Sequence, residues 1–410
     1  MKKQTIVIIV VIVALVIIGI VLALGITQPV TAQPIKVGAL MEYTGAWSGW
    51  GPYQDDEMAV CENVINSDPP LGRKIVWVKY DMRSTAEGGL DAVKKMVTID
   101  GVNLIIYLDS VTGPAIRPWL QETGRLSEIF IITCFGGGLP DNWGGTKESP
   151  WFRVMIPDTA QAWAQAHWVA QKGFTKAVVM GSITEEVAVW IEAIQKALPA
   201  KGVNVLDVVK FEPGQTSYRD VLARAMASNP QVVLLGAMDE DAGIIWKQAY
   251  EMGFTPTWVA INDAATARSI ELAGGADLSK TYATAPAGIG AGYDEFLRQW
   301  KRVLPDRGPY ALSAGAWDSM IALALAIEKA GNTKAASLVD AIREVCLPPG
   351  EKVTSYQEAV KLIRKGVDID FEGAASNLNF DANGNVWGDF WVLSAKGTTW
   401  EQIATITNYR

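Results

Sequence analysis

Two hydroxyl side chains stand between a predicted strand and a predicted helix, where they could hold an oxygen-bearing ligand. Ser110 and Thr112 follow the apolar run 104–108 and precede the helical segment 113–126. The first N–H groups of a helix have no partner within the helix, so together with hydroxyl groups they form a cradle for an anion. We therefore expect Ser110 and Thr112 to bind a ligand, with simple capping of the helix as the alternative role.

A run of three glycines, 136–138, directly follows Phe135 and the predicted strand 129–133. Glycine allows the backbone to approach a ligand closely, although a glycine run also serves as a plain turn. Two tryptophans, Trp47 and Trp50, lie in the loop after the first predicted strand. A large ring left in water is unfavourable, so we expect both rings to line a cleft.

Enzymatic chemistry finds little support in the residue types. His167 is the only histidine, and its place in the middle of a predicted helix indicates a structural role. There is no nucleophile elbow, phosphate-binding loop or cysteine pair with metal-ligand spacing, so we expect no catalytic residue, metal or cofactor. The net charge of −8 argues against nucleic-acid binding. The three cysteines, Cys61, Cys134 and Cys346, allow one disulfide at most, and the sequence does not identify the pair.

The elements that must position these residues alternate along the chain. Strands are predicted at 35–40, 74–81, 104–108, 129–133, 152–155, 176–180, 204–209, 232–235 and 257–260. Helices are predicted at 54–67, 88–100, 113–126, 159–172, 184–198, 218–228, 240–251, 293–303, 312–330 and 334–344. Such alternation is typical of α/β units with parallel sheets. A C-terminal hairpin is predicted from 378–380 to 386–393, because Asn-Gly at 383–384 is a strong turn signal.

The N-terminus has the pattern of an export signal. Two lysines precede the uncharged apolar run 6–26, which is long enough to span a bilayer. We expect this helix to stay as a membrane anchor with the lysines in the cytoplasm. The alternative is cleavage after Ala32 and release of the chain. The 410-residue chain is long enough for two domains.

Four segments resemble, in order and spacing, the type I periplasmic binding proteins, and specifically the branch that binds branched-chain amino acids and amides. They are Ile-Lys-Val-Gly at 35–38 with Thr-Gly-Ala-Trp-Ser-Gly-Trp-Gly at 44–51, Val-Lys-Tyr-Asp at 78–81, Asp-Ser-Val-Thr-Gly-Pro-Ala at 109–115, and Asn-Leu-Asn-Phe-Asp-Ala-Asn-Gly at 377–384. The resemblance covers about 33–406 and implies two Rossmann-like lobes joined by three crossovers, with a ligand between them. The expected division is 1–34 as signal, anchor and stalk, 35–155 with 283–371 as lobe 1, and 156–282 with 372–410 as lobe 2.

The resemblance also implies roles for single residues of lobe 1. In the family, the serine that matches Ser110 holds the ligand carboxylate. Residues matching Phe135 and Gly137 bind the same carboxylate, although Gly137 lacks the hydroxyl group that the family uses. The family position matching Trp50 is aromatic and touches the ligand side chain.

In lobe 2, the family binds the ligand ammonium through an aromatic residue after one strand and a carboxylate after the next. Here Met238 takes the aromatic position, and Asn262 takes the acidic one, with Asp263 displaced by one residue. Either Asp239 or Asp263 turns inward and binds a cation, or the ligand is a neutral amide-like or carboxylate compound. The alternative role of Asp239 is to cap the following helix.

The resemblance therefore implies an extracytoplasmic solute-binding component of an ABC importer, without enzymatic activity. Its partners would be a small-molecule ligand, the permease subunits with their ATPases, and the membrane through the N-terminal helix. Two alternatives stay open. One is a binder of amide or urea-type ligands. The other is a membrane-anchored ligand-sensing ectodomain, which we disfavour because only about five residues would lie inside the cell.

Overall fold

The computed structural model describes residues 33–287, 290–310 and 312–409. The predicted anchor, 6–26, and the alternative cleavage site at Ala32 lie outside this part of the chain. Within the described residues, no helix combines the length and the apolar character that crossing a membrane requires.

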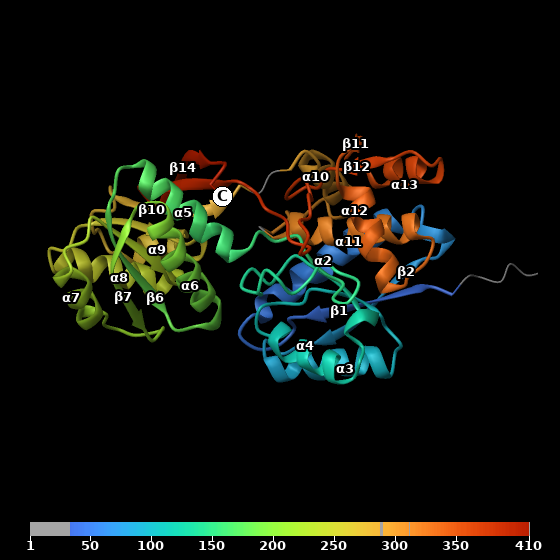
Figure 1. Cartoon of the computed structure of the whole chain (residues 1–410), viewed down its shortest axis with the longest axis horizontal. Coiled ribbons are helices and arrows are strands. Elements are labelled where there is room, and N and C mark those ends of the chain that lie inside the picture. The colour runs from blue at the N-terminus through green and yellow to red at the C-terminus, as the bar shows by residue number, and fades with distance from the viewer. Residues whose placement is uncertain (1–32, 288–289, 311, 410) are drawn as a thin grey trace, which may run out of the picture. The chain divides into compact units, whose positions relative to one another are not determined.

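The first lobe is built on a five-stranded parallel sheet in the order β2-β1-β3-β4-β5. Its strands are β1 (Ile35–Met41), β2 (Ile75–Asp81), β3 (Leu104–Ile106), β4 (Phe130–Thr133) and β5 (Trp151–Arg153). The helices between them are α2 (Gly51–Ile65), α3 (Ala86–Thr98) and α4 (Gly113–Glu122), with short 3₁₀ turns η1 (Ser48–Trp50), η2 (Pro70–Gly72) and η3 (Leu126–Glu128). Figure 1 shows this lobe with two of its helices, α3 and α4, beside β1. Strand β1 is buried at every position except Lys36, as a central strand of a parallel sheet covered on both faces must be.

A later part of the chain completes this lobe. It forms α10 (Tyr293–Val303), α11 (Ser313–Ala330), α12 (Ala335–Cys346) and α13 (Tyr356–Arg364), with a two-stranded parallel sheet of β11 (Glu351–Val353) and β12 (Ile369–Phe371). Helix α11 is buried over nearly its whole length, which explains why its sequence is apolar on all sides. These elements share one hydrophobic core with β1–β5, and residues as late as Val386 belong to it.

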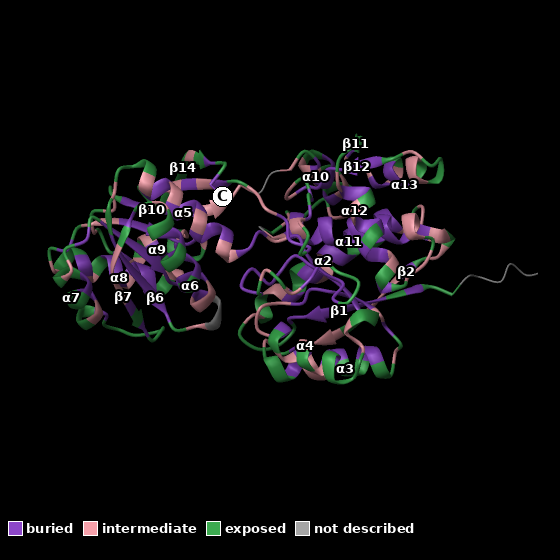
Figure 2. Cartoon of the chain, viewed as in Figure 1, coloured by how far each residue is buried: buried purple, intermediate pink, exposed green. Residues whose placement is uncertain are grey.

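The second lobe is built on a seven-stranded sheet in the order β14-β13-β10-β9-β8-β6-β7. Its strands are β6 (Lys176–Ser182), β7 (Asn204–Phe211), β8 (Val232–Gly236), β9 (Thr257–Ala260), β10 (Thr281–Pro286), β13 (Phe390–Lys396) and β14 (Thr399–Ile406). Its helices are α5 (Asp158–Gln171), α6 (Glu185–Ala200), α7 (Arg219–Ala227), α8 (Asp239–Glu251) and α9 (Ala267–Leu272), with the 3₁₀ turn η4 (Asn262–Ala264). Two separate cores fill this lobe, and Figure 2 shows β6 mostly buried and α7 largely exposed.

The predicted α/β class with two sheet-based lobes is confirmed. The chain leaves the first sheet after β5, returns to the first core after β10, and enters the second sheet again at β13. The predicted lobe boundaries at 155, 283 and 371 stay a prediction.

The predicted position of the C-terminal hairpin is wrong. Its two strands are β13 and β14, which pair antiparallel, whereas 378–380 form no strand. The Asn-Gly signal does mark a turn, since the N–H of Gly384 donates to the carbonyl of Asp381 at 3.1 Å. The Asp381 carboxylate also accepts N–H bonds from Asn383 and Asn385, so the segment satisfies its own polar groups locally.

Candidate functional site

A cavity of about 500 Å³ opens where the strands of both sheets end. The carboxyl ends of parallel strands are the usual place for ligands in α/β folds. Most of the lining residues come from the loops after β1, β3 and β4 in the first lobe and after β8 and β9 in the second. The others lie after β5, on α5 and α6, and just before α11. They include nine of the ten residues predicted to bind a ligand, which are Trp47, Trp50, Ser110, Phe135, Gly137, Met238, Asp239, Asn262 and Asp263. Their binding role stays a prediction.

Aromatic rings form the first-lobe wall of the cavity. The ring of Trp50, at the end of η1, lies 5.6 Å from Trp47, 5.2 Å from Phe135 and 5.8 Å from Tyr310, centroid to centroid. Phe135 in turn stacks on the buried Tyr107 at 5.5 Å. Trp50 is therefore held on several sides, and its ring presents an ordered apolar surface to a ligand.

Thr112 does not line the cavity, although it was predicted to bind the ligand. Its side chain is fully buried, and its hydroxyl donates to Asp109 Oδ1 at 2.6 Å. The N–H of Thr112 donates to the same carboxylate oxygen at 2.7 Å. Asp109 thus occupies donors at the start of α4 and places its own carboxylate at the cavity instead. Ser110 does line the cavity, and its oxygen accepts the N–H of Gly138 at 3.1 Å.

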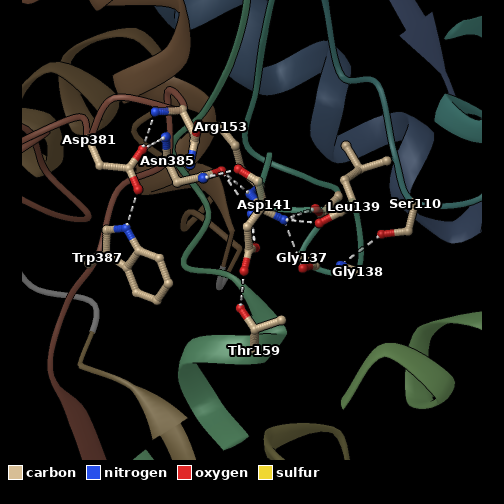
Figure 3. Close-up of polar contacts among 12 residues, drawn as sticks. Ser110, Gly137, Gly138, Leu139, Asp141, Arg153, Thr159, Asp381, Asn385 and Trp387 are labelled. Atoms are coloured by element: carbon tan, nitrogen blue, oxygen red, sulfur yellow. Dashed lines mark hydrogen bonds and ion pairs between the residues drawn. The ribbon is translucent and has the colours of Figure 1, made fainter. Parts of the chain in front are cut away.

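The glycine loop is held by a buried arginine (Figure 3). Arg153, at the end of β5, is only 4% exposed and donates to the carbonyls of Gly136, Gly137 and Leu139 at 2.8–2.9 Å. A side chain at Gly137 would overlap the carboxylate of Asp158, which begins α5. Glycine is therefore required here for packing against this acid, apart from any contact with a ligand.

Arg153 also joins segments that are far apart in sequence. Its guanidinium donates to Asp141 Oδ1 and to Asn385 Oδ1, both at 2.8 Å, and Thr159 donates to the other oxygen of Asp141 at 2.7 Å. These contacts fix the chain where it passes from the first sheet to α5 and where it approaches β13. A basic residue in a predicted buried strand was the available signal for this role, because a buried arginine needs several acceptors.

The second-lobe wall carries the predicted polar residues. Asp239 begins α8, and its Oδ2 accepts the hydroxyl of Thr266 at 2.8 Å. Asn262 and Asp263 lie on η4, directly after β9. Water reaches the exposed side chain of Asp263, but the surrounding protein still removes much of its solvation. This loss of solvation, together with the nearby charge of Asp239, raises the pKa of Asp263.

Glu42 is a site residue that sequence reasoning missed. It follows β1 directly, lines the cavity, and is only 3% exposed. Burial raises the pKa of Glu42 to about 7; a hydrogen bond from Ser84 at 2.6 Å lowers it, and the charges of Asp109 and Asp81 raise it further. Burial likewise raises the pKa of Asp109, against the hydrogen bonds from Thr112. In the sequence, a single acid after an apolar strand looks the same whether it lines a cavity or lies in a solvated loop.

The histidine and the three cysteines do not line the cavity. His167 hydrogen-bonds Gln171 one turn further along α5, and burial with the charge of Lys201 lowers its pKa. Cys61, Cys134 and Cys346 are all buried and unbonded. Within the described part of the chain, no cluster of His, Cys, Asp and Glu side chains is arranged to hold a metal ion.

Glu57 is a second buried carboxyl and lies beneath the aromatic wall. Its raised pKa should make the stability of the folded protein depend on pH. Glu57 on α2 accepts hydrogen bonds from Tyr107 and Ser313, both at 2.7 Å. Burial raises its pKa from 4.5 to about 7, although these bonds lower it. The folded state binds the proton of Glu57 more tightly than the unfolded state does, so this proton stabilises the fold. The stabilisation is complete below pH 4.5 and is lost as the pH rises through 7. We expect wild type to lose about 2–3 kcal/mol more unfolding free energy than Glu57→Gln between pH 4.5 and 8.

Urea denaturation at both pH values measures this difference. Glu358→Gln, at an exposed position of α13, is the matched control and should follow the wild type. Equal pH dependence of wild type and Glu57→Gln would show that Glu57 has the same pKa in the folded and the unfolded protein.

Solved structures of two-lobed binding proteins resemble this chain along nearly its whole length. A leucine-binding protein LivK from Thermotoga maritima is 21% identical, with a TM-score of 0.70 over 91% of this chain and 99% of that one. LivJ from Streptococcus pneumoniae, in complex with isoleucine, is 17% identical, with a TM-score of 0.64 over 91% and 98% of the two chains. An ABC transporter solute-binding protein from R. palustris, in complex with benzoate, is 15% identical, with a TM-score of 0.66 over 91% and 96%.

These likenesses identify the fold as that of the type I periplasmic binding proteins. No curated protein sequence matches the chain. The sequence model of the periplasmic binding protein family matches residues 34–350, which is more than half of the chain. The chain therefore belongs to the periplasmic binding protein family.

Proposed function

We propose that this chain is the extracytoplasmic solute-binding component of an ABC importer. The observation that carries the proposal is the cavity of about 500 Å³, which residues of both lobes line. That volume suits a small solute, and closure of two lobes on a ligand is a common means of burying it. The proteins of similar fold described above include binders of leucine, isoleucine and benzoate, which supports a small polar ligand.

The proposal includes no reaction on this chain. Ser110 has one of the hydroxyl groups that line the cavity, and its oxygen accepts the N–H of Gly138. A nucleophilic serine needs a neighbouring general base that takes its proton. We propose that Ser110 instead contacts the bound solute as a polar group of the cavity wall.

We also propose a membrane anchor and transport partners for this chain. We propose that the apolar run 6–26 anchors the protein to the outer face of the cell membrane, where permease subunits with their ATPases receive the solute. The lobes would be the two sheet units, with the chain crossing near residues 155 and 283 and between 371 and 390. Opening and closing about these three crossings would admit and release the solute.

Solute screening tests the proposed binding function. The purified full-length chain is heated with amino acids, simple amides, urea, amines and aromatic acids in turn, and its melting temperature is measured. At least one class should raise the melting temperature, because a ligand that binds only the folded state stabilises it by mass action. The rise should depend on concentration and should be smaller in Trp50→Ala at the same solute concentration. A chain that no solute stabilises would contradict the proposal.

Uptake measurements separate transport from sensing. Cells that lack this chain should lose uptake of the identified solute at low concentration, and the restored gene should return it. Undiminished uptake, together with a lost transcriptional response to the same solute, would favour the role of a ligand-sensing ectodomain.

A further inference from the structure

The charged side chains of the cavity are all acidic. Its lining includes five carboxylates, which are Glu42, Asp109, Asp158, Asp239 and Asp263. They come from both lobes. None of the lining residues in the described part of the chain is Lys, Arg or His. A ligand carboxylate would therefore meet several like charges in a partly desolvated space without a cationic partner, which is strongly unfavourable.

Several of the donors that were expected to hold a ligand carboxylate are used within the protein. The hydroxyl and N–H of Thr112 both donate to Asp109, at 2.6 and 2.7 Å. The N–H of Gly138 donates to Ser110 at 3.1 Å. The N–H of Phe135 donates to Thr133 Oγ1 at 3.0 Å. Asp109 therefore already accepts both donors of Thr112, the residue that precedes α4.

The charges of neighbouring acids also act on two of these carboxylates, Glu42 and Asp263. The charges of Asp109 and Asp81 add to the burial that raises the pKa of Glu42, and the charge of Asp239 adds to the burial that raises the pKa of Asp263. Burial and like charges both favour the neutral form of an acid. A positively charged ligand would bring an opposite charge close to Glu42 and Asp263.

The aromatic lining suits the same kind of ligand. Five aromatic residues line the cavity, which are Trp47, Trp50, Phe135, Trp190 and Tyr310. The faces of aromatic rings attract ammonium groups, most strongly for tryptophan and where water is excluded. The apolar area of these rings also accommodates the hydrocarbon part of an amine.

We infer that the solute is an organic cation, with an ammonium group on an apolar body and no carboxylate. This inference rests on the proposed solute-binding function and narrows it to one substrate class. It departs from the amino-acid and benzoate ligands of the proteins with similar folds, because the five carboxylates would oppose the carboxylate group of either ligand.

A series of three matched compounds tests the substrate class. Leucine, 3-methylbutylamine and 4-methylpentanoate share one branched chain and carry both charges, only the cation and only the anion, respectively. Each is titrated into the full-length chain at pH 7.5, with calorimetry and tryptophan fluorescence as readouts. The amine should bind at least about tenfold more tightly than leucine, a ratio that corresponds to 1.4 kcal/mol, and the acid should bind most weakly.

A charge-removing variant links this order to the cavity. Asp263→Asn should weaken binding of the amine about tenfold, while Asp220→Asn, at an exposed position of α7, should leave it unchanged. Tighter binding of leucine or of the acid than of the amine would overturn the cationic ligand and leave the solute-binding function standing. Absence of binding by all three compounds, together with a solute screen in which nothing binds, would overturn both.

Discussion

Replacing Arg153 by methionine is expected to lower the free energy of unfolding by about 3–5 kcal/mol. The guanidinium is buried and serves three carbonyl groups, the carboxylate of Asp141 and the side chain of Asn385. Methionine fills a similar volume but donates no hydrogen bond. The Asp141 charge and the carbonyl oxygens would then lose a buried partner, which costs more than the original pair contributed.

Urea denaturation followed by circular dichroism measures this change. The matched control is Arg224→Met, because the Arg224 side chain is 59% exposed and pairs with Asp207 at the surface of the second lobe. Exposed pairs contribute about 1 kcal/mol or less, so this variant should remain close to wild type. If both variants lost equally little stability, Arg153 would not hold the glycine loop in the way described.

Replacing Trp50 by alanine is expected to weaken solute binding by about 30- to 100-fold. Trp50 is the central ring of the first-lobe wall, in contact with Trp47, Phe135 and Tyr310. Truncation of a central aromatic residue typically costs about 2–3 kcal/mol of binding free energy, which corresponds to that range of affinity. Calorimetric titration with the solute found by screening measures the loss.

The control for this prediction is Tyr250→Ala. Tyr250 lies on α8, is 49% exposed and is not part of the cavity lining. Its replacement should leave the affinity unchanged, and both variants should melt within a few degrees of wild type without solute. Unchanged affinity in Trp50→Ala would place the binding site elsewhere.

The sequence predicted the positions of the site residues better than their contacts. Nine predicted residues reach one cavity because each follows a strand, and parallel strands end at a common edge. Thr112 fails because it lies two residues further than Ser110, at the N-cap of α4, where its side chain is fully buried. Periodicity predicts the helix, but it does not predict which side chain at its start faces the core.

The acidic character of the cavity could not be predicted in the same way. Glu42 and Asp158 belong to loops or helix starts whose sequences fit ordinary solvated surface equally well. Whether these acids line a cavity depends on which side chains lie opposite them in the folded chain, and a single sequence does not give those distances. The composition shows only that acids exceed bases in the whole chain.

The C-terminal part was the least predictable. Strand β10 was not predicted, because it is short and ends at Pro286, which reads as a break. Strand β14 is mostly exposed and has little apolar alternation, so its pairing with β13 is a tertiary contact that the local pattern does not report. The Asn-Gly turn at 383–384 was identified correctly, but the flanking residues are held by Arg153 instead of by a hairpin partner.

Hydrogen exchange with and without the identified solute tests the site most directly. The account predicts slower exchange on binding in two groups of peptides that lie far apart in sequence. One group covers 47–50, 109–110 and 135–138 of the first lobe, and the other covers 238–239 and 262–266 of the second. Protection confined to a single lobe, or located away from both groups, would contradict the account.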